Sequence, residues 1–138
     1  MYEHKVQYYE SDGMGITHHS NYIRWFEEAR VALLEHLGYP YEEIEQQGVG
    51  SPVLTASAAY KASTRFGDVV RVSARVTGYT GVKLFLAYEV YNKATGALCC
   101  TGETSHCFTD KSGKPVILRR VWPELHEMFS ETAKQTEA

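Results

Sequence analysis

The segment with the clearest potential for chemistry is the polar loop between residues 10 and 20. One carboxylate, Asp12, lies there beside Gly13 and Gly15, and a helical pattern begins near Ser20. Backbone N–H groups and the positive end of a helix dipole can hold a carboxylate at such a place and favour its ionised form. A lone Asp in a Gly-containing loop is more often a turn or cap residue, so its interpretation depends on its neighbours.

These neighbours have a recognisable order. They resemble the signature Tyr-x-Asp/Glu-x-Asp-x-x-Gly of hotdog-fold acyl-CoA thioesterases of the 4-hydroxybenzoyl-CoA type, including the Tol-Pal-associated bacterial branch. The matching residues are Tyr8, Glu10, Asp12 and Gly15 in the loop, His19, Asn21 and Tyr22 at the helix start, and Phe26, Glu27, Ala29 and Arg30 further along. The resemblance extends over about residues 5–110.

The resemblance implies a role for each of four residues. Asp12 would act on a thioester carbonyl, either as the nucleophile or as the general base for water. The backbone N–H of His19 would polarise that carbonyl from the helix N-terminus, and losing such a donor typically costs about 10²–10³ in rate. Gly15 would let the backbone bend and approach the substrate. Tyr8, expected at the end of the first strand, would hydrogen-bond the substrate or the water.

Coenzyme A would also need cations for its phosphates. Arg65 lies in the segment 60–68, which resembles the family's Tyr-x-x-Pro-x-x-x-x-Asp strand exit, although Ser63 replaces the usual Pro. Lys83 matches a position at which related enzymes carry basic residues. Both are candidates for contacting the substrate, although a solvated surface charge is the more common role of such a residue.

Three other interpretations have less support. Adjacent histidines of a strand point to opposite faces, so His18 and His19 could not both join Asp12 and no metal site is expected. Glu10 is expected to contact solvent or serve the structure, and it is a weaker second carboxylate candidate. A non-catalytic acyl or CoA-binding module stays open, whereas a hotdog dehydratase would need a catalytic His where Asp12 stands. No cofactor is implied, because the coenzyme A thioester is itself the substrate.

Composition restricts the class of protein. The 138 residues carry 14 basic and 17 acidic side chains, a net charge of −3, and are 43% hydrophobic. These values fit one folded domain over residues 1–138 and exclude a disordered chain or a strongly basic nucleic-acid binder. No apolar run approaches the roughly 20 residues of a membrane span. Three clustered cysteines, an odd number, predict a reduced, cytoplasmic protein.

The hydrophobic periodicity predicts an α+β fold. Three- and four-residue spacing indicates a long helix from Ser20 to about Leu37 and a short one over 40–47. Strands are expected over 2–9, 53–61, 70–77, 84–91 and 98–109, followed by an extended piece and a last helix from about Pro123. The expected architecture, a five-stranded antiparallel sheet wrapped around one long central helix, is the hotdog fold. Exposed sheet edges, together with the resemblance, predict a homo-oligomer, either a dimer or a tetramer.

Overall fold

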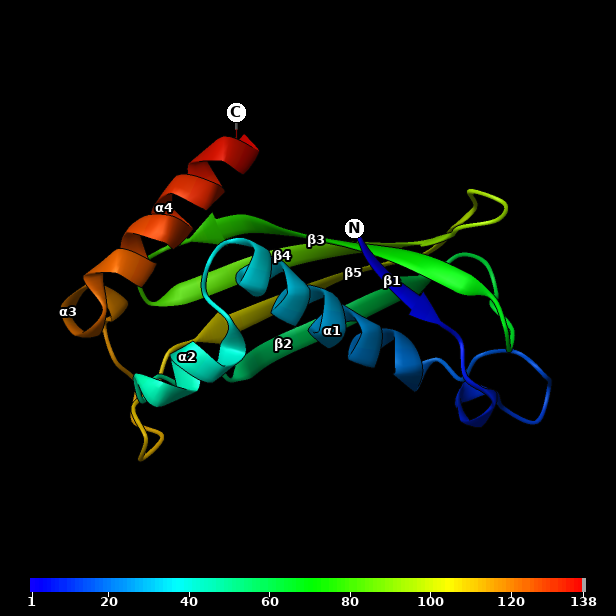
Figure 1. The fold of residues 1–138 in the computed structure, drawn as a ribbon, viewed down its shortest axis with the longest axis horizontal. Coiled ribbons are helices and arrows are strands. Elements are labelled where there is room, and N and C mark those ends of the chain that lie inside the picture. Colours follow the sequence, from blue (N-terminus) through cyan, green and yellow to red (C-terminus); the bar gives the residue numbers. More distant parts are fainter. Residues whose placement is uncertain (138) are drawn as a thin grey trace.

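A five-stranded antiparallel sheet forms the framework of the computed structural model, which describes residues 1–137. The strands are β1 (Tyr2–Lys5), β2 (Val53–Tyr60), β3 (Val69–Tyr79), β4 (Lys83–Asn92) and β5 (Leu98–Cys107). Their spatial order is β1-β3-β4-β5-β2, so β1 and β2 form the two edges (Figure 1). The sequence therefore predicted all five strands and their antiparallel arrangement correctly.

The helix α1 (Ser20–His36) lies across one face of this sheet (Figure 1). Its side chains Trp25 and Phe26 have no exposed surface, as their place in the apolar pattern predicted. Phe26 stacks on Tyr88 of β4 with ring centroids 4.6 Å apart. A Cβ atom at Gly102 would collide with the Phe26 ring and lie 2.8 Å from the carbonyl oxygen of Ser57, so this close helix–sheet contact requires glycine.

A second long helix was underestimated by the sequence. The 15-residue α4 (Pro123–Glu137) packs against β3 and is nearly as long as the 17-residue α1. Leu125 and Phe129 of α4 are buried in the same core as α1, and the hydroxyl of Tyr79 in β3 lies 2.7 Å from His126 Nδ1. The picture of one central helix is therefore too simple, because two long helices contribute to the layer that covers the sheet.

Three smaller elements complete the chain. The short helix α2 (Tyr41–Gln46) lies where it was predicted. A one-turn helix, α3 (Leu118–Val121), stands where an extended piece was expected. The first strand ends at Lys5 rather than Tyr9, and residues 8–10 form the 3₁₀ turn η1 (Tyr8–Glu10). The reason is local, since the Glu10 carboxylate accepts a hydrogen bond from the backbone N–H of Gln7 and bends the chain.

The three cysteines all lie on β5. Cys99 and Cys100 are buried, Cys107 is half-buried, and all three are free thiols. Burial raises the pKa of Cys100 to about 11, which keeps it protonated and unreactive at neutral pH. The thiols of Cys99 and Cys100 are thus part of the packing.

Candidate active site

Asp12 lies in a tight turn at the end of the molecule where α1 begins. Its backbone N–H donates to the carbonyl of Ile16 over 2.8 Å, and its own carbonyl accepts from Gly15 over 3.1 Å. The carboxylate oxygen Oδ1 accepts a hydrogen bond from the N–H of Met14 over 2.7 Å. Gly15 has a φ of +79°, the left-handed conformation that favours glycine. The carboxylate is half-buried and held by a backbone amide, as the loop predicted.

The buried Glu10 fixes this loop to the core. Only 4% of the residue is exposed, and its carboxylate accepts hydrogen bonds from the Gln7 amide and the Trp25 indole, each over 2.8 Å. His4 Nε2 lies 2.8 Å from the same carboxylate. Burial by itself raises the pKa of Glu10, but these hydrogen bonds outweigh burial and hold the pKa below its usual range. Glu10 therefore has a structural role, which is one of the two roles that the sequence analysis expected for it.

The loop is also tied to the start of α1 through its backbone. The carbonyl of Glu10 accepts from the His18 N–H over 2.8 Å and from the Asn21 side-chain amide over 3.0 Å. Asn21 is buried, and its side chain holds the loop rather than capping α1. The residue before the helix is His19, and no side chain caps this end.

The backbone N–H of His19 is unused within the described residues. Neighbouring amides are occupied, since Ser20 donates to the His18 ring, Asn21 to the His18 carbonyl and Tyr22 to the His19 carbonyl. Over residues 1–137 the His19 amide donates no hydrogen bond. A free donor at a helix N-terminus, reinforced by the helix dipole, is suited to bind a developing negative charge.

A cleft of about 410 Å³ lies next to this donor. His19 and Tyr22 line it at the start of α1, and Tyr60 and Lys61 line it at the end of β2. The Tyr60 hydroxyl donates a hydrogen bond to the His19 carbonyl over 3.2 Å, which holds the helix start against the edge strand. The Tyr22 hydroxyl lies 3.0 Å from Thr64 Oγ1, a buried contact that holds the Tyr22 side chain in place.

The structure places the two adjacent histidines differently from the prediction. The rings of His18 and His19 stack with centroids 4.2 Å apart instead of pointing to opposite faces, because the chain turns into α1 here. Within the described part of the chain, no group of three or more His, Cys, Asp or Glu side chains could hold a metal ion.

The remaining predicted residues are dispersed. Tyr8 belongs to η1 rather than to a strand, is 78% exposed and packs edge-on against Phe66 with centroids 5.7 Å apart. Arg65 is exposed near the same end of the molecule. Lys83 is paired with Cys107 at the start of β4, the opposite end of the sheet from Tyr60, so one chain does not bring Lys83 to the Asp12 loop.

Two residues of the cleft were missed by the sequence. Tyr60 and Lys61 end a strand of small side chains, and both lie in the segment where the resemblance singled out Arg65. Nothing in their own types indicates that the end of β2 lies beside the start of α1. That contact joins residues 41 positions apart, and only a comparison of the two element ends in space reveals it.

Comparison with known proteins decides the family. Residues 6–133 match the Thioesterase-like superfamily. The chain belongs to this superfamily. It is also 37% identical over 133 residues to a Bacillus subtilis protein named "Putative acyl-CoA thioesterase YneP", a match covering 96% of each chain. A shorter match, 24% identity over 88 residues, covers 64% of this chain and 66% of the acyl-CoA thioester hydrolase YbgC from Escherichia coli.

Solved structures agree with the sequence relatives. The DHNA-CoA thioesterase from Staphylococcus aureus superposes with a TM-score of 0.94 at 34% identity, covering 99% of this chain and 91% of that one. Hotdog-type relatives therefore confirm the resemblance, and the chain is an enzyme of the thioester hydrolase class. In residues 1–137 no helix is both long and apolar enough to cross a membrane.

Proposed function

We propose that this member of the thioesterase-like superfamily hydrolyses an acyl-CoA to a free acid and coenzyme A, with Asp12 and the His19 backbone amide as its catalytic groups. The unused N–H of His19 beside the cleft is the observation that carries the proposal. The names of the relatives from Bacillus subtilis and Staphylococcus aureus support an acyl-CoA substrate.

The chemistry needs one attacking oxygen and one donor for the thioester oxygen. The Asp12 carboxylate attacks the carbonyl carbon itself, or takes a proton from a water that attacks. In either route the negative charge moves to the carbonyl oxygen, which accepts a hydrogen bond from the His19 N–H. The C–S bond then breaks, and coenzyme A leaves as a thiolate that takes up a proton. When Asp12 itself attacks, the acyl group remains on its carboxylate as a mixed anhydride, which water then hydrolyses to the free acid and free Asp12. By either route one water is consumed, and no cofactor enters these steps.

The basic residues at the rim are assigned to the phosphates of coenzyme A. Lys61 lines the cleft, and Arg65 is exposed four residues later. Gly15 lets the loop approach the substrate, and Tyr8 supplies a hydroxyl near it. Lys83 joins such a site only from a second copy of the chain, because it lies at the other end of its own sheet.

The edge strand β2 is the surface at which we expect the second copy. Its eight residues, Val53–Tyr60, contain no charge and no proline, and most of them are exposed. Soluble proteins normally protect such an edge with charges, bulges or a covering element, since it offers free backbone donors and acceptors. Antiparallel pairing of two β2 strands would satisfy these groups and form a dimer, which could assemble further into a tetramer. We expect this homo-oligomer to act in the cytoplasm.

Release of free thiol from acyl-CoA tests the catalytic proposal. Asp12→Asn removes the charge of the carboxylate but keeps its turn contact to Met14, so the fold is expected to persist while turnover falls by about 10³-fold or more. Asp110→Asn is the matched control, because Asp110 accepts from the backbone N–H two residues later in the same way and lies in a distant turn.

Calorimetry with a slowly hydrolysed acyl-CoA analogue separates binding from turnover. Retained turnover in Asp12→Asn would overturn the role of Asp12. Tight binding without any thiol release by the unmodified protein would instead favour a non-catalytic acyl or CoA-binding module.

A further inference from the structure

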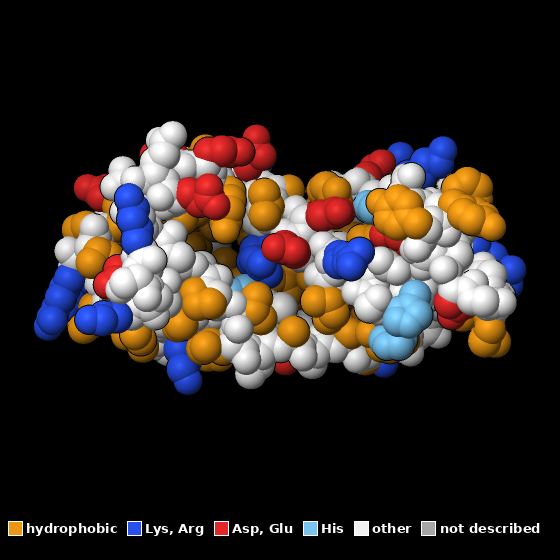
Figure 2. Space-filling model, turned by 90° about the horizontal axis from the view of Figure 1, so that it is seen from below, with side chains coloured by type: hydrophobic (Ala, Val, Ile, Leu, Met, Phe, Trp, Pro, Cys, Tyr) orange, Lys and Arg blue, Asp and Glu red, His pale blue; other side chains and the backbone are white. Residues whose placement is uncertain are grey.

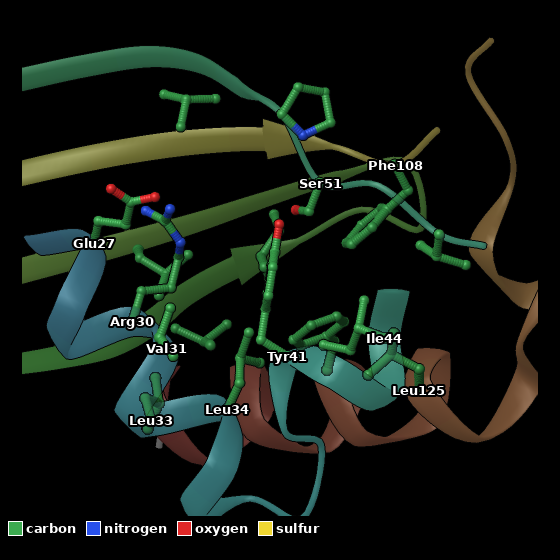
Figure 3. Close-up of a pocket in the computed structure, with 17 residues that line it drawn as sticks. Glu27, Arg30, Val31, Leu33, Leu34, Tyr41, Ile44, Ser51, Phe108 and Leu125 are labelled. Atoms are coloured by element: carbon green, nitrogen blue, oxygen red, sulfur yellow. The ribbon is translucent and has the colours of Figure 1, made fainter. Parts of the chain in front are cut away.

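A second cavity lies at the other end of α1. It encloses about 330 Å³ between α1, α2, the beginning of β2 and α4. The walls are mainly apolar, and Figure 3 shows Leu34, Ile44, Leu125 and Phe108 around the space. In Figure 2 the surface is hollowed here, with hydrophobic side chains inside the hollow. A cavity of this size equals the volume of about ten water molecules.

One cation, Arg30, projects from α1 into this apolar setting (Figure 3). Its side chain is half-buried, yet within residues 1–137 its guanidinium group forms no ion pair. The neighbouring Glu27 lines the same end of the cavity but forms no ion pair with Arg30. The hydrogen bond of Arg30 in the described chain runs from Nη1 to the Tyr88 hydroxyl over a long 3.4 Å. A guanidinium has five N–H donors, so most of its capacity is unused.

The buried groups behind Arg30 do not neutralise its charge. The Tyr88 hydroxyl lies 2.7 Å from Thr104 Oγ1, which in turn lies 2.9 Å from His106 Nε2. These three side chains form one hydrogen-bonded chain, in which His106 Nδ1 is left without a partner among the described residues, and no carboxylate belongs to it. An unpaired, partly buried cation is costly, and an oxygen acceptor that entered the cavity would lower this cost.

Within one chain the cavity is far from the proposed thioester site. Arg30 lies eleven positions after His19, a rise of about 16 Å along the helix. The two sites also lie at opposite ends of the edge strand β2. Val53 at its beginning lines the cavity, and Tyr60 at its end lines the cleft beside His19. Antiparallel pairing of two β2 strands about their middle reverses this separation. It places Val53 of one copy next to Tyr60 of the other.

We propose that the Arg30 cavity of one copy receives the acyl group of a thioester held at His19 of the other copy, and that Arg30 binds an oxygen acceptor at the far end of this acyl group. The favoured substrates are accordingly compact acyl-CoA esters that end in a carboxylate or a ring hydroxyl, in preference to plain alkyl or aryl esters. This inference rests on the proposed function and assigns a specificity-determining residue to it.

A matched substrate panel tests the role of Arg30. Thiol release is measured for glutaryl-CoA against hexanoyl-CoA and for 4-hydroxybenzoyl-CoA against benzoyl-CoA. We expect the unmodified protein to prefer at least one oxygen-bearing member by about 10- to 100-fold in kcat/KM, the range of a charge-assisted hydrogen bond. The pair with the larger preference identifies whether the acceptor is a carboxylate or a hydroxyl.

Substitution then has to remove the preference without removing turnover. Arg30→Met is expected to lose the preferred ester's advantage and to keep its rate on the apolar ester, whereas Arg24→Met, an exposed arginine of the same helix, behaves as the unmodified protein. Arg30→Lys keeps the charge, provides a second variant should Arg30→Met fail to fold, and is expected to retain part of the preference. An unchanged ratio in Arg30→Met or Arg30→Lys overturns the inference while the proposed function stands. No thiol release from any ester by the unmodified protein overturns both.

Complementation shows whether the cavity acts across the interface. Asp12→Asn and Arg30→Met chains are co-expressed with different tags, and the mixed dimers are assayed on the preferred ester. A shared site gives each mixed dimer one site with both native residues, so activity rises clearly above that of either parent dimer. If the cavity serves its own chain, every site lacks one residue and no gain appears, which would overturn the assignment across the interface.

Discussion

The indole Nε1 of Trp25 donates a hydrogen bond to Glu10 Oε2 over 2.8 Å, and this contact joins the centre of α1 to the loop that carries Asp12. Trp25 has no exposed surface, so the bond is shielded from water. The position of the Asp12 loop is thus set by a buried carboxylate two residues before Asp12, and this loop and the hydrophobic core are stabilised together.

Glu10→Gln is therefore expected to weaken the fold at neutral pH. The amide keeps one acceptor oxygen where the carboxylate has two, and a hydrogen bond to a charged group is worth about 1–3 kcal/mol. Because folding lowers the pKa of Glu10, its contribution is present above the ordinary value of 4.5 and is lost as the pH falls through the lower folded value.

Urea unfolding at pH 7 and pH 3 measures this effect. The loss of unfolding free energy on acidification should be smaller in Glu10→Gln than in the unmodified protein. Glu131→Gln, at an exposed position of α4, serves as the control. Equal acid sensitivity of Glu10→Gln and the unmodified protein would show that the buried carboxylate contributes nothing.

Two substitutions at His19 separate its backbone from its ring. His19→Ala removes only the ring and is expected to keep most of the turnover. His19→Pro also removes the N–H, and the φ of −56° at this position is close to that of proline, so the helix start should tolerate it. Loss of the donor predicts a fall of about 10²–10³ in kcat. Steady-state kinetics measure kcat of both variants. A fall in kcat of His19→Ala as large as that of His19→Pro would show that the imidazole ring, not the backbone N–H, supports turnover.

The free edge of β2 can be blocked by one residue. Lys61 N–H donates to Cys99 of β5, so by alternation the N–H groups of residues 55, 57 and 59 face β5 and that of Ala56 points to the free edge. Ala56→Pro removes this donor without breaking the sheet of its own chain. Sedimentation velocity should find the unmodified protein and Ala56→Val as dimers or larger assemblies and Ala56→Pro as a monomer. Unchanged assembly of Ala56→Pro would exclude β2 as the interface.

His106 predicts a second, separate pH dependence of stability. Burial, reinforced by the nearby Arg30, lowers the pKa of His106 to about 4 from an ordinary value of 6.5. Between these two pH values His106 is protonated in the unfolded chain but neutral in the folded chain. The unfolding free energy therefore falls by about 2–3 kcal/mol as the pH drops from 6.5 to 4. His106→Gln retains a donor near Nε2 and cannot titrate. Unfolding curves between pH 7 and pH 4 should be flatter for this variant, and parallel curves would contradict the assignment.

Local patterns in the sequence determined most of the secondary structure. Alternation along β3 and β4 and three- to four-residue spacing along α1 reflect burial on one side of each element, which neighbouring residues reveal by themselves. The Asp12 turn is equally local, since Gly15 supplies its left-handed conformation and Met14 its amide. The family could also be predicted from this loop, because its signature residues lie at fixed spacing within one short segment and can be read without knowing the tertiary structure.

Only the tertiary structure decided which distant groups meet. Tyr60 reaches the His19 carbonyl, Arg30 enters an apolar cavity without an ion-pair partner among the described residues, and a second long helix closes that cavity. Each contact depends on how a strand end, a helix face and the C-terminal segment pack together. The spacing of residues along the chain does not reveal such packing. A tyrosine or arginine on an exposed surface can have the same local sequence pattern as one that makes these contacts.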